Sequence, residues 1–445
     1  MITVDALRRR LAGVDPLPPI GWVEEVVGLG VVSEGPRRAI GDAVRIRPAG
    51  GGELPAEVIG FRPGGRLLLL PLGEAAGLEA GDVVRADGPL RVPVGSGIRG
   101  RLLDGLGRPL DGGPPVGGAR VPLAGRPPAP LERRPIREPL WTGVAAIDAL
   151  LTLGRGQRIG IFAGAGVGKT TLMHQILEGT AADLAVVALV GERGREVAEF
   201  YQSLDASRRD RIVVVATTAA EPPLLRLKAV ETATRMAEAA RDQGLQVLLL
   251  VDSLTRVAMA AREVGLAAGE PPSARGYPPS VFAMLPRLFE RAGATARGSI
   301  TAVYTVLLDG DDPDDPVSDA VRGLLDGGIY LARELAERHQ FPAIDLTRSL
   351  SRVMPAVVPA AQWEVAGEVR RLLSRFERAR DLVELGAYRP GRDAELDRAL
   401  AVVPAVWEAL RQAPGEHVDP AQALARVEAA LRTPPLTAEL EEVEA

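Results

Sequence analysis

Apolar residues form three successive patterns along the chain, and each pattern predicts a different architecture. The first runs from Ile20 to Val92, where short apolar runs are separated by glycine-containing turns. Short strands with frequent turns predict a small all-β barrel over residues 20–92. The runs that we assign to strands are Val26–Val27, Val31–Val32, Val44–Ile46, Glu57–Ile59, Leu67–Leu70 and Val83–Val84.

The second pattern, from Thr142 to Val358, alternates apolar strands with helical segments. This alternation predicts a parallel sheet covered by helices, and we place this α/β domain at residues 93–360. The proline-rich stretch from Pro114 to Pro139 is expected to run extended over its surface. The strand candidates are residues 158–163, 184–190, 211–217, 246–252 and 299–308.

The third pattern begins at Gln362 and has the three- and four-residue steps of a helix face. It predicts a C-terminal helical domain over residues 361–445, with an acidic, loosely attached tail after Pro434. The apolar positions of the first helix in this domain are Trp363, Ala366, Val369, Leu373, Phe376, Leu382 and Val383.

The first twelve residues predict one short amphipathic helix, within a segment at residues 1–19 that precedes the barrel. Ile2, Leu7 and Leu11 fall near one side, and the run Arg8–Arg10 lies beside them. A helix this short is marginal alone in water. We therefore expect it to dock its apolar side on the barrel or on a partner. A membrane surface is a weaker alternative, because three arginines attract anionic lipid only modestly.

The composition is that of a globular, multidomain protein. The 445 residues are 46% hydrophobic and carry a formal net charge of -5, which gives no reason to expect nucleic acid as a partner. No run of 18 apolar residues could span a bilayer, and arginines occupy the region where a signal peptide needs an apolar stretch. The lack of cysteine agrees with a cytoplasmic location.

Lysine is nearly absent, and one of only two lysines lies in a glycine-rich segment. The 53 lysines and arginines include Lys169 and Lys228 as the only lysines. The segment Ala163-Gly-Ala-Gly-Val-Gly-Lys-Thr170 matches the phosphate-binding loop pattern, between an apolar strand and a helical segment. A compact ammonium fits a ring of backbone amides around a polyphosphate better than a planar guanidinium does. The residues assigned to ATP binding are Ala163, Gly164, Ala165, Gly166, Val167, Gly168, Lys169, Thr170 and Thr171.

Two acidic residues follow apolar strands, at the edge of a parallel sheet where ligands bind. Asp252 ends the strand 246–252 and, with Lys169 upstream, is predicted to act on Mg²⁺, although a helix-capping role is the alternative. Glu192 follows the run 184–190 and could polarise an attacking water. The residues alone favour a simpler interpretation for Glu192, a solvated cluster of charges at the end of a strand.

The segment 341–352 carries an aromatic residue, Phe341, and the arginine Arg352 in a loop-like context. The guanidinium group of an arginine can bind two phosphoryl oxygens at once, so Arg352 could stabilise a transition state. The chain has many arginines, however, and for any one of them a surface ion pair is the simpler interpretation. The three histidines have no metal-ligand spacing: His174, His339 and His417.

Long matched segments show that the chain resembles the type III secretion ATPases, the export motors of flagella and injectisomes, which are related to the rotary F-type ATP synthases. The resemblance runs from about Gly21 to about Leu410. The segments that carry it are Trp141–Leu151, Gly191–Val197, Asp252–Ala260, Gly276–Phe282, Pro286–Gly293, Asp319–Gly327 and Leu385–Gly391.

The resemblance implies a RecA-like parallel-sheet ATPase core between an N-terminal small β-barrel and a C-terminal helical domain. It implies a Mg²⁺-dependent ATPase that works as a homohexamer, with sites between neighbouring subunits, at the cytoplasmic side of the inner-membrane export apparatus. The implied partners are a stator-like regulator at the N-terminal helix, a coiled-coil stalk in the ring pore, the export gate, chaperones and export substrates.

Residue roles are also implied by position. Lys169 would bridge the β- and γ-phosphates, Thr170 would bind magnesium, and Asp252 would act through the magnesium shell. Glu192 would activate water. This role replaces the solvated charge cluster that the neighbouring residues alone favour.

The remaining roles concern aromatic and basic residues. Arg193 and Arg256 would lie near the γ-phosphate, and Phe341 falls where the family places an aromatic side chain against adenine. Arg352 would reach into the site of the neighbouring subunit.

Several functions stay open at this point. Ser349–Pro355 looks flagellar, whereas Pro71–Glu74 looks more like the injectisome branch, and we favour the flagellar export ATPase. A non-hydrolysing nucleotide-binding ring subunit is a structural alternative, against which Glu192 speaks. A hexameric RNA translocase would need a basic, aromatic-rich N-terminal domain, but aromatic residues make up only 4% of this acidic chain.

Overall fold

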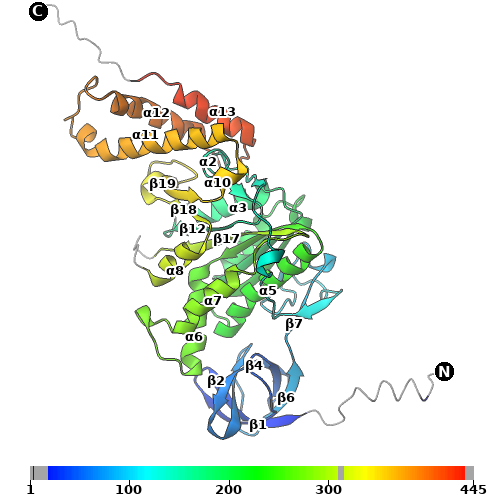
Figure 1. Ribbon diagram of the computed structural model, residues 1–445. Helices are drawn as coiled ribbons and strands as arrows, with labels where there is room; N and C mark the ends of the chain where they lie inside the picture. Colours follow the sequence, from blue (N-terminus) through cyan, green and yellow to red (C-terminus); the bar gives the residue numbers. More distant parts are fainter. Residues whose placement is uncertain (1–3, 5–18, 309–314, 436–445) are drawn as a thin grey trace, which may run out of the picture.

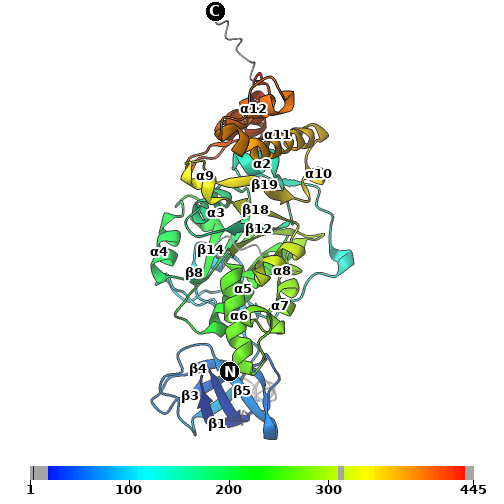
Figure 2. The same cartoon turned by 90° about the vertical axis from the view of Figure 1, so that its left-hand side faces the viewer.

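The structure, a computed structural model, describes residue 4, residues 19–308 and residues 315–435. The molecule is elongated: a β-barrel lies at one end, a sheet with helices on both faces forms the middle, and a group of helices lies at the other end (Figures 1 and 2). The helix expected at residues 1–12 and most of the acidic tail lie outside the described residues.

Six strands close into the N-terminal barrel in the order β1-β2-β5-β4-β3-β6. All six predicted apolar runs lie in these strands, so the prediction of a small barrel is confirmed. Alternate side chains fill its interior, among them Val31, Val44, Val58 and Leu69. The strands are β1 (Ile20–Val27), β2 (Gly30–Glu34), β3 (Ala43–Arg47), β4 (Leu54–Arg62), β5 (Arg66–Pro71) and β6 (Val83–Gly88).

The central sheet runs in the order β19-β18-β12-β17-β15-β13-β14-β8, and β16 pairs with β17 outside this path. The five predicted strands are present and parallel: β12 (Arg158–Ala163), β13 (Leu184–Glu192), β14 (Ile212–Thr218), β15 (Gln246–Asp252) and β17 (Ser299–Leu307). Four strands were not predicted: β8 (Leu102–Leu103), β16 (Gly293–Ala294), β18 (Gly327–Leu331) and the antiparallel edge strand β19 (Ile344–Ser351).

Helices cover both faces of this sheet, which explains why its strands are continuously apolar. Ile159 and Ile161 face one helical layer, and the intervening strand positions face the other. The first layer contains α2 (Ala145–Leu150), α3 (Lys169–Gly179), α4 (Gly194–Ser203) and the C-terminal helices. The second contains α5 (Pro223–Asp242), α6 (Leu254–Ala268), α7 (Pro279–Phe289) and α8 (Pro316–Leu324).

The C-terminal region consists of α11 (Ala360–Glu384), α12 (Ala394–Leu410) and α13 (Pro420–Leu431). The predicted apolar face of α11 is confirmed for the middle of the helix, where Ala366, Val369 and Leu373 are buried. It is wrong at the ends, because Trp363 is 37% exposed and Leu382 is 54% exposed. The α11 helix continues beyond the surface on which it packs, so its apolar spacing alone overstates the buried stripe.

Short elements complete the described chain. In the proline-rich stretch, β9 (Arg120–Pro122) and η3 (Pro130–Glu132) interrupt extended backbone. The others are β7 (Arg91–Pro93), β10 (Pro139–Leu140), β11 (Leu153–Gly154), α9 (Arg333–Glu337), α10 (Met354–Val357), η1 (Pro63–Gly65), η2 (Ser96–Ile98), η4 (Arg209–Arg211) and η5 (Ala274–Gly276). Of all the helices in the described part of the chain, none is both long enough and apolar enough to cross a membrane.

A buried ion pair joins the barrel to the central domain. Lys228 of α5 places its ammonium 2.7 Å from a carboxylate oxygen of Glu57 in β4 and 3.1 Å from one of Glu231. Lys228 and Glu57 are both buried. Removing one partner of a buried pair costs about 3–5 kcal/mol because it leaves the other charge unpaired, so loss of either residue should weaken the contact between the barrel and α5.

Candidate active site

Three parallel strands end at the same edge of the sheet and bring the predicted chemistry into a single pocket. Ala163 ends β12, Glu192 ends β13 and Asp252 ends β15. A pocket of about 510 Å³ opens at this carboxyl edge of the sheet. It is lined by Lys169, Thr170, His174, Leu189, Glu192, Arg195, Glu196, Glu199, Phe200, Ser203, Asp252, Arg256 and Leu307.

The loop between β12 and α3 has the shape that phosphate binding requires. Gly166 and Gly168 adopt φ angles of +77° and +92°, a left-handed conformation that suits glycine. Gly168 is the N-cap of α3, so the loop amides and the positive end of the helix face the same side. A side chain added at Gly166 would meet nothing within 4 Å, which leaves the cradle open. These features fit a polyphosphate.

Lys169 and Asp252 meet at the centre of the pocket as an ion pair. Thr305 of β17 donates a hydrogen bond of 2.6 Å to the same carboxylate oxygen of Asp252. Asp252 does not cap α6, because the side chain of Ser253 is the N-cap and accepts a hydrogen bond from the Arg256 amide. The structure therefore contradicts the helix-capping alternative for Asp252.

The donors in the pocket also fit Mg²⁺, which keeps several waters and binds one or two protein oxygens together with substrate phosphates. Thr170 lies exposed in the first turn of α3, and both Thr170 and Asp252 line the pocket. Over the described ranges, no group of three or more histidine, aspartate or glutamate side chains forms a metal cage. A metal held here would share its coordination with the nucleotide.

Glu192 is turned into the pocket by an irregularity of β13. The pairing of β13 with β14 shifts register between Val190 and Glu192, and Gly191 between them has a φ of +70°. Such a bulge redirects the following side chain. Glu192 is only 8% exposed, so the interpretation as a solvated charge cluster is wrong.

Arg256 holds Glu192 in place. Its guanidinium lies 3.0 Å from a carboxylate oxygen of Glu192 and also donates to the carbonyl oxygen of Gly191. Burial, then the negative charge of Asp252, raise the pKa of Glu192 to about 7, while Arg256 and Lys169 oppose this shift. A carboxyl group whose pKa is near neutrality is suited to proton transfer at physiological pH.

This pKa predicts the pH dependence of the free enzyme. The role that the resemblance implies for Glu192, polarising water, would require its ionised form, and its raised pKa leaves it increasingly protonated as the pH falls through about 7. We therefore expect kcat/KM for ATP to rise from acidic pH and to level off above about pH 7. Steady-state assays of the wild type across this range would test the assignment, and a flat profile would contradict it.

Arg193 and Arg352 lie outside this pocket. The Arg193 side chain is 83% exposed and pairs with Glu196 at 3.5 Å. Arg352 follows β19 and is exposed, and its amide donates to the Asp326 carbonyl oxygen beside Arg158, at the amino end of β12. The phosphate loop begins at the other end of that strand, roughly 17 Å away at about 3.3 Å per residue. The backbone of Arg352 therefore lies at the end of the sheet opposite the phosphate loop of its own chain.

Phe341 lies beside the phosphate loop. A methyl group placed at Gly168 would lie 3.7 Å from the Phe341 ring. Phe341 is half-buried, which leaves part of the ring available for contact.

Sequence reasoning missed two polar residues of the site. Thr305 is buried in β17, but Ser299 and Thr301 of the same strand are buried polar residues too, so the sequence held no signal that singles Thr305 out. Glu196 hydrogen-bonds Glu192 from α4 and helps to raise its pKa. Its spacing of four residues from Glu192 is compatible with a shared site but also with an ordinary helical surface.

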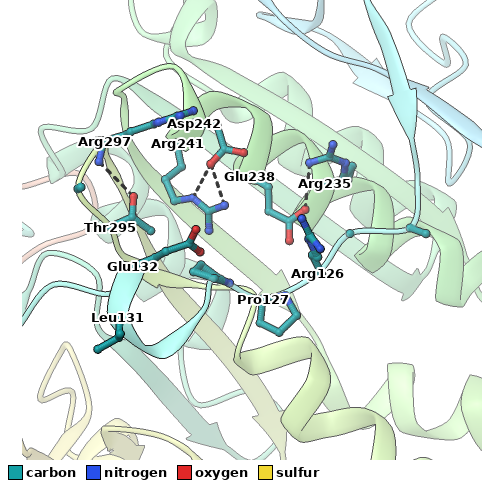
Figure 3. Close-up of a pocket in the computed structure, with 14 residues that line it drawn as sticks. Arg126, Pro127, Leu131, Glu132, Arg235, Glu238, Arg241, Asp242, Thr295 and Arg297 are labelled. Carbon is teal, nitrogen blue, oxygen red and sulfur yellow. Dashed lines mark hydrogen bonds and ion pairs between the residues drawn. The ribbon is translucent and has the colours of Figure 1, made fainter.

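A larger pocket, of about 770 Å³, lies under the proline-rich stretch. Figure 3 shows acidic and basic side chains alternating around it, with Arg241 bound to Asp242 and Arg235 to Glu238. Its walls include the segment 295–297 just before β17, at the amino edge of the sheet. This pocket is therefore remote from the phosphate loop and from the predicted chemistry.

Two protein families match consecutive parts of the chain. Residues 143–351 match the ATP synthase alpha/beta family, nucleotide-binding domain. Residues 358–429 match the T3SS EscN ATPase C-terminal domain. The first match contains Lys169, Glu192, Asp252 and Phe341, and the second contains α11, α12 and most of α13.

Similar proteins of comparable length include members from flagella and from injectisomes. The chain is 50% identical to the flagellum-specific ATP synthase of Bacillus subtilis, over 89% of this chain and 91% of that relative. It is 48% identical to the type 3 secretion system ATPase of Xanthomonas euvesicatoria, over 91% of this chain and 92% of that relative.

The fold agrees with these similarities. The assembled ATPase EscN from the type III secretion system of enteropathogenic E. coli superposes with a TM-score of 0.88 at 42% identity, over 92% of this chain and 100% of that chain. The chain belongs to the family of type III secretion ATPases, which includes the flagellum-specific members.

Proposed function

We propose that this chain hydrolyses ATP to energise type III protein export, and that its system is the flagellar one. The observation that carries the proposal is the single pocket in which a phosphate-binding loop, the Lys169–Asp252 pair and the buried acid Glu192 meet. Binding alone would need the loop and the lysine. A buried, arginine-held glutamate at the same edge adds the group that hydrolysis requires.

In this proposal the loop residues Ala163 to Thr171 hold the phosphates, and Lys169 neutralises part of their charge. Thr170 and Asp252 hold Mg²⁺, which supplies charge neutralisation at the phosphoryl oxygens. Glu192 orients the attacking water and accepts its proton. Arg256 keeps Glu192 aligned.

Two further roles complete the proposed site. Phe341 packs against the adenine, as its position beside Gly168 supports. Arg193, exposed at the start of α4, is proposed to turn toward the γ-phosphate in the loaded enzyme.

We also propose that six copies form a ring with a stalk in its pore. EscN, at 42% identity, has been solved as an assembled ATPase and in complex with its central stalk EscO. The outward position of Arg352 supports a site completed by a neighbouring copy. We further propose that residues 1–19 bind a stator-like regulator, and that the ring meets the export gate, chaperones and export substrates at the cytoplasmic side of the inner membrane, without nucleic acid.

The substitution Glu192→Gln tests this function. The amide keeps the size of the side chain but cannot accept a proton, so hydrolysis should fall about 10²–10⁴-fold while ATP binding persists. Turnover and nucleotide affinity of the purified protein should be measured together. A variant that hydrolyses ATP at the wild-type rate would remove Glu192 from the mechanism.

The same variant separates the flagellar from the injectisome alternative in cells. A strain carrying Glu192→Gln should stop secreting flagellar filament protein and lose motility. If filaments form normally and other secreted proteins disappear instead, the injectisome assignment is correct. If the purified wild type binds ATP without hydrolysing it, the chain is a structural ring subunit.

A further inference from the structure

The loop that carries Phe341 is fastened to the end of α12. The backbone amide of Gln412, in the turn after α12, donates a hydrogen bond of 2.8 Å to the carbonyl oxygen of Phe341. The side chain of Gln340 donates a bond of 2.8 Å to the carbonyl oxygen of Trp407, in the last turn of α12. Two neighbouring residues of the Phe341 loop are thus held by the C-terminal helical region.

The side chain of Gln412 fixes the position of its own backbone. It is 2% exposed, and its oxygen accepts a bond of 3.0 Å from the Ala145 amide. Its nitrogen donates to the carbonyl oxygens of Gly143, at 2.7 Å, and Glu416, at 2.6 Å. Both donors are used, and these partners define the orientation of the amide. The turn is therefore attached rigidly to the start of α2.

The start of α2 is itself held by buried hydrogen bonds. One oxygen of Asp148 accepts bonds from the amide and the hydroxyl of Thr142, at 2.9 and 2.8 Å. The other accepts a bond of 2.8 Å from the Gly143 amide. Gln412 thus transmits the position of a well-fixed part of the central domain to the Phe341 loop.

The same turn also contacts the helix that begins with Lys169. Gln175 of α3 is buried and donates a bond of 3.0 Å to the carbonyl oxygen of Ala413. The turn after α12 therefore binds the Phe341 loop on one side and the phosphate-loop helix on the other. It sets the spacing between the aromatic ring and the phosphate loop.

We infer that Gln412 is a positioning residue that holds Phe341 at the distance from the phosphate loop that a purine base requires, so that the C-terminal helical region sets affinity for the base. This inference rests on the proposed function, because it needs ATP at the loop and Phe341 against its base. Gln412 acts through Phe341 and has no role in the phosphoryl transfer itself.

The prediction separates the base from the phosphates. In Gln412→Ala the turn loses its attachment to Gly143 and Ala145, and the Phe341 loop loses its fixed position. The dissociation constant for ATP should rise about tenfold, as expected when one well-placed contact is lost. The dissociation constant for inorganic tripolyphosphate, which has no base, should change by less than about twofold. Competition of both probes against a fluorescent ATP analogue measures the two constants.

Gln362 provides a matched control. It is also a buried glutamine of the C-terminal region that binds α2, through the carbonyl oxygens of Asp148 and Ala149 at 2.9 and 3.1 Å. Its remaining hydrogen bond goes to the hydroxyl of Thr152, at 3.1 Å, so in the described part of the chain these side-chain bonds hold α2 and not the Phe341 loop. Gln362→Ala should lower the unfolding temperature much as Gln412→Ala does, yet leave both dissociation constants near the wild-type values.

One additional variant keeps the inference testable if Gln412→Ala is poorly folded, and a double variant tests whether Gln412 acts through Phe341. Gln340→Ala removes the second attachment of the same loop and should also weaken ATP binding selectively. In a Phe341→Ala background, Gln412→Ala should weaken ATP binding by less than about twofold further, because the two residues act in series.

The outcomes are distinct. Equal losses for ATP and tripolyphosphate, or unchanged ATP binding in well-folded variants, would overturn the role of Gln412. If the wild type itself bound neither probe, the proposed function would fail instead.

Discussion

Replacing Lys169 with alanine is expected to abolish ATP hydrolysis, with turnover below about one-thousandth of the wild-type rate. The ammonium is the one lysine charge in the pocket, and it lies against the carboxylate of Asp252 at the base of the site. Without it, the charge that develops on the phosphoryl oxygens loses a charge-assisted hydrogen bond that no other side chain of the loop replaces. Coupled-enzyme assays with equal amounts of folded protein would measure the loss.

Two variants test the reason for this loss. Lys169→Arg keeps the charge but introduces a planar guanidinium group that does not fit inside the loop, so ATP hydrolysis should be lost as well. Wild-type turnover in this variant would show that the loop does accommodate the larger group. Arg195→Ala removes a cation from the rim of the same pocket, where the side chain is 85% exposed and pairs with Glu199. Its turnover should stay within about twofold of the wild type, because exposed ion pairs contribute little.

Loss of Arg352 is expected to lower turnover about 10³–10⁵-fold, as for an arginine finger supplied in trans. The residue lies at the amino end of β12, whereas the phosphate loop of the same chain lies at the carboxyl end. In the proposed ring Arg352 completes the site of a neighbouring copy, so specific activity should also rise with protein concentration. Activity measured over a dilution series would show this dependence.

Mixing two inactive proteins should restore part of the activity. In mixed rings of Arg352→Ala and Lys169→Ala subunits, some interfaces pair an intact phosphate loop with an intact Arg352. Arg348→Ala is the matched control, because this exposed arginine of β19 lies over the ring of Tyr330 in its own chain, 5.0 Å from the centroid. If verified mixed rings showed no rescue, Arg352 would not act across the interface.

The strands that the sequence reveals are those buried on both faces. β13 and β15 read as continuous apolar runs because helices cover them on either side. β19 was not predicted because it is an edge strand. Exposed Arg348 and Leu350 interrupt its buried positions, and its polar sequence is typical of a loop. Burial, which depends on tertiary packing, decides whether the spacing of apolar residues is informative.

The site shows the same division between local and tertiary information. Lys169 could be placed from eight consecutive residues, because its loop is a local structure. Glu192 could not, because its burial depends on the bulge at Gly191 and on Arg256, 64 positions away in the sequence. The link from Gln412 to Phe341 joins residues 71 positions apart and left no local signal in either segment.

The buried pair of Lys228 and Glu57 affects which parts of the molecule can move relative to one another. Because the pair lies between β4 and α5, we expect the barrel and α5 to move as one rigid body during a nucleotide cycle. The opposite end is attached to the core through neutral hydrogen bonds, such as those of Gln362 and Gln412, which exchange at lower cost than an enclosed charge pair. The two ends of the molecule are thus coupled to the core by different chemistry, a charge pair at the barrel and neutral hydrogen bonds at the helical end, so salt and pH should act differently on the two attachments.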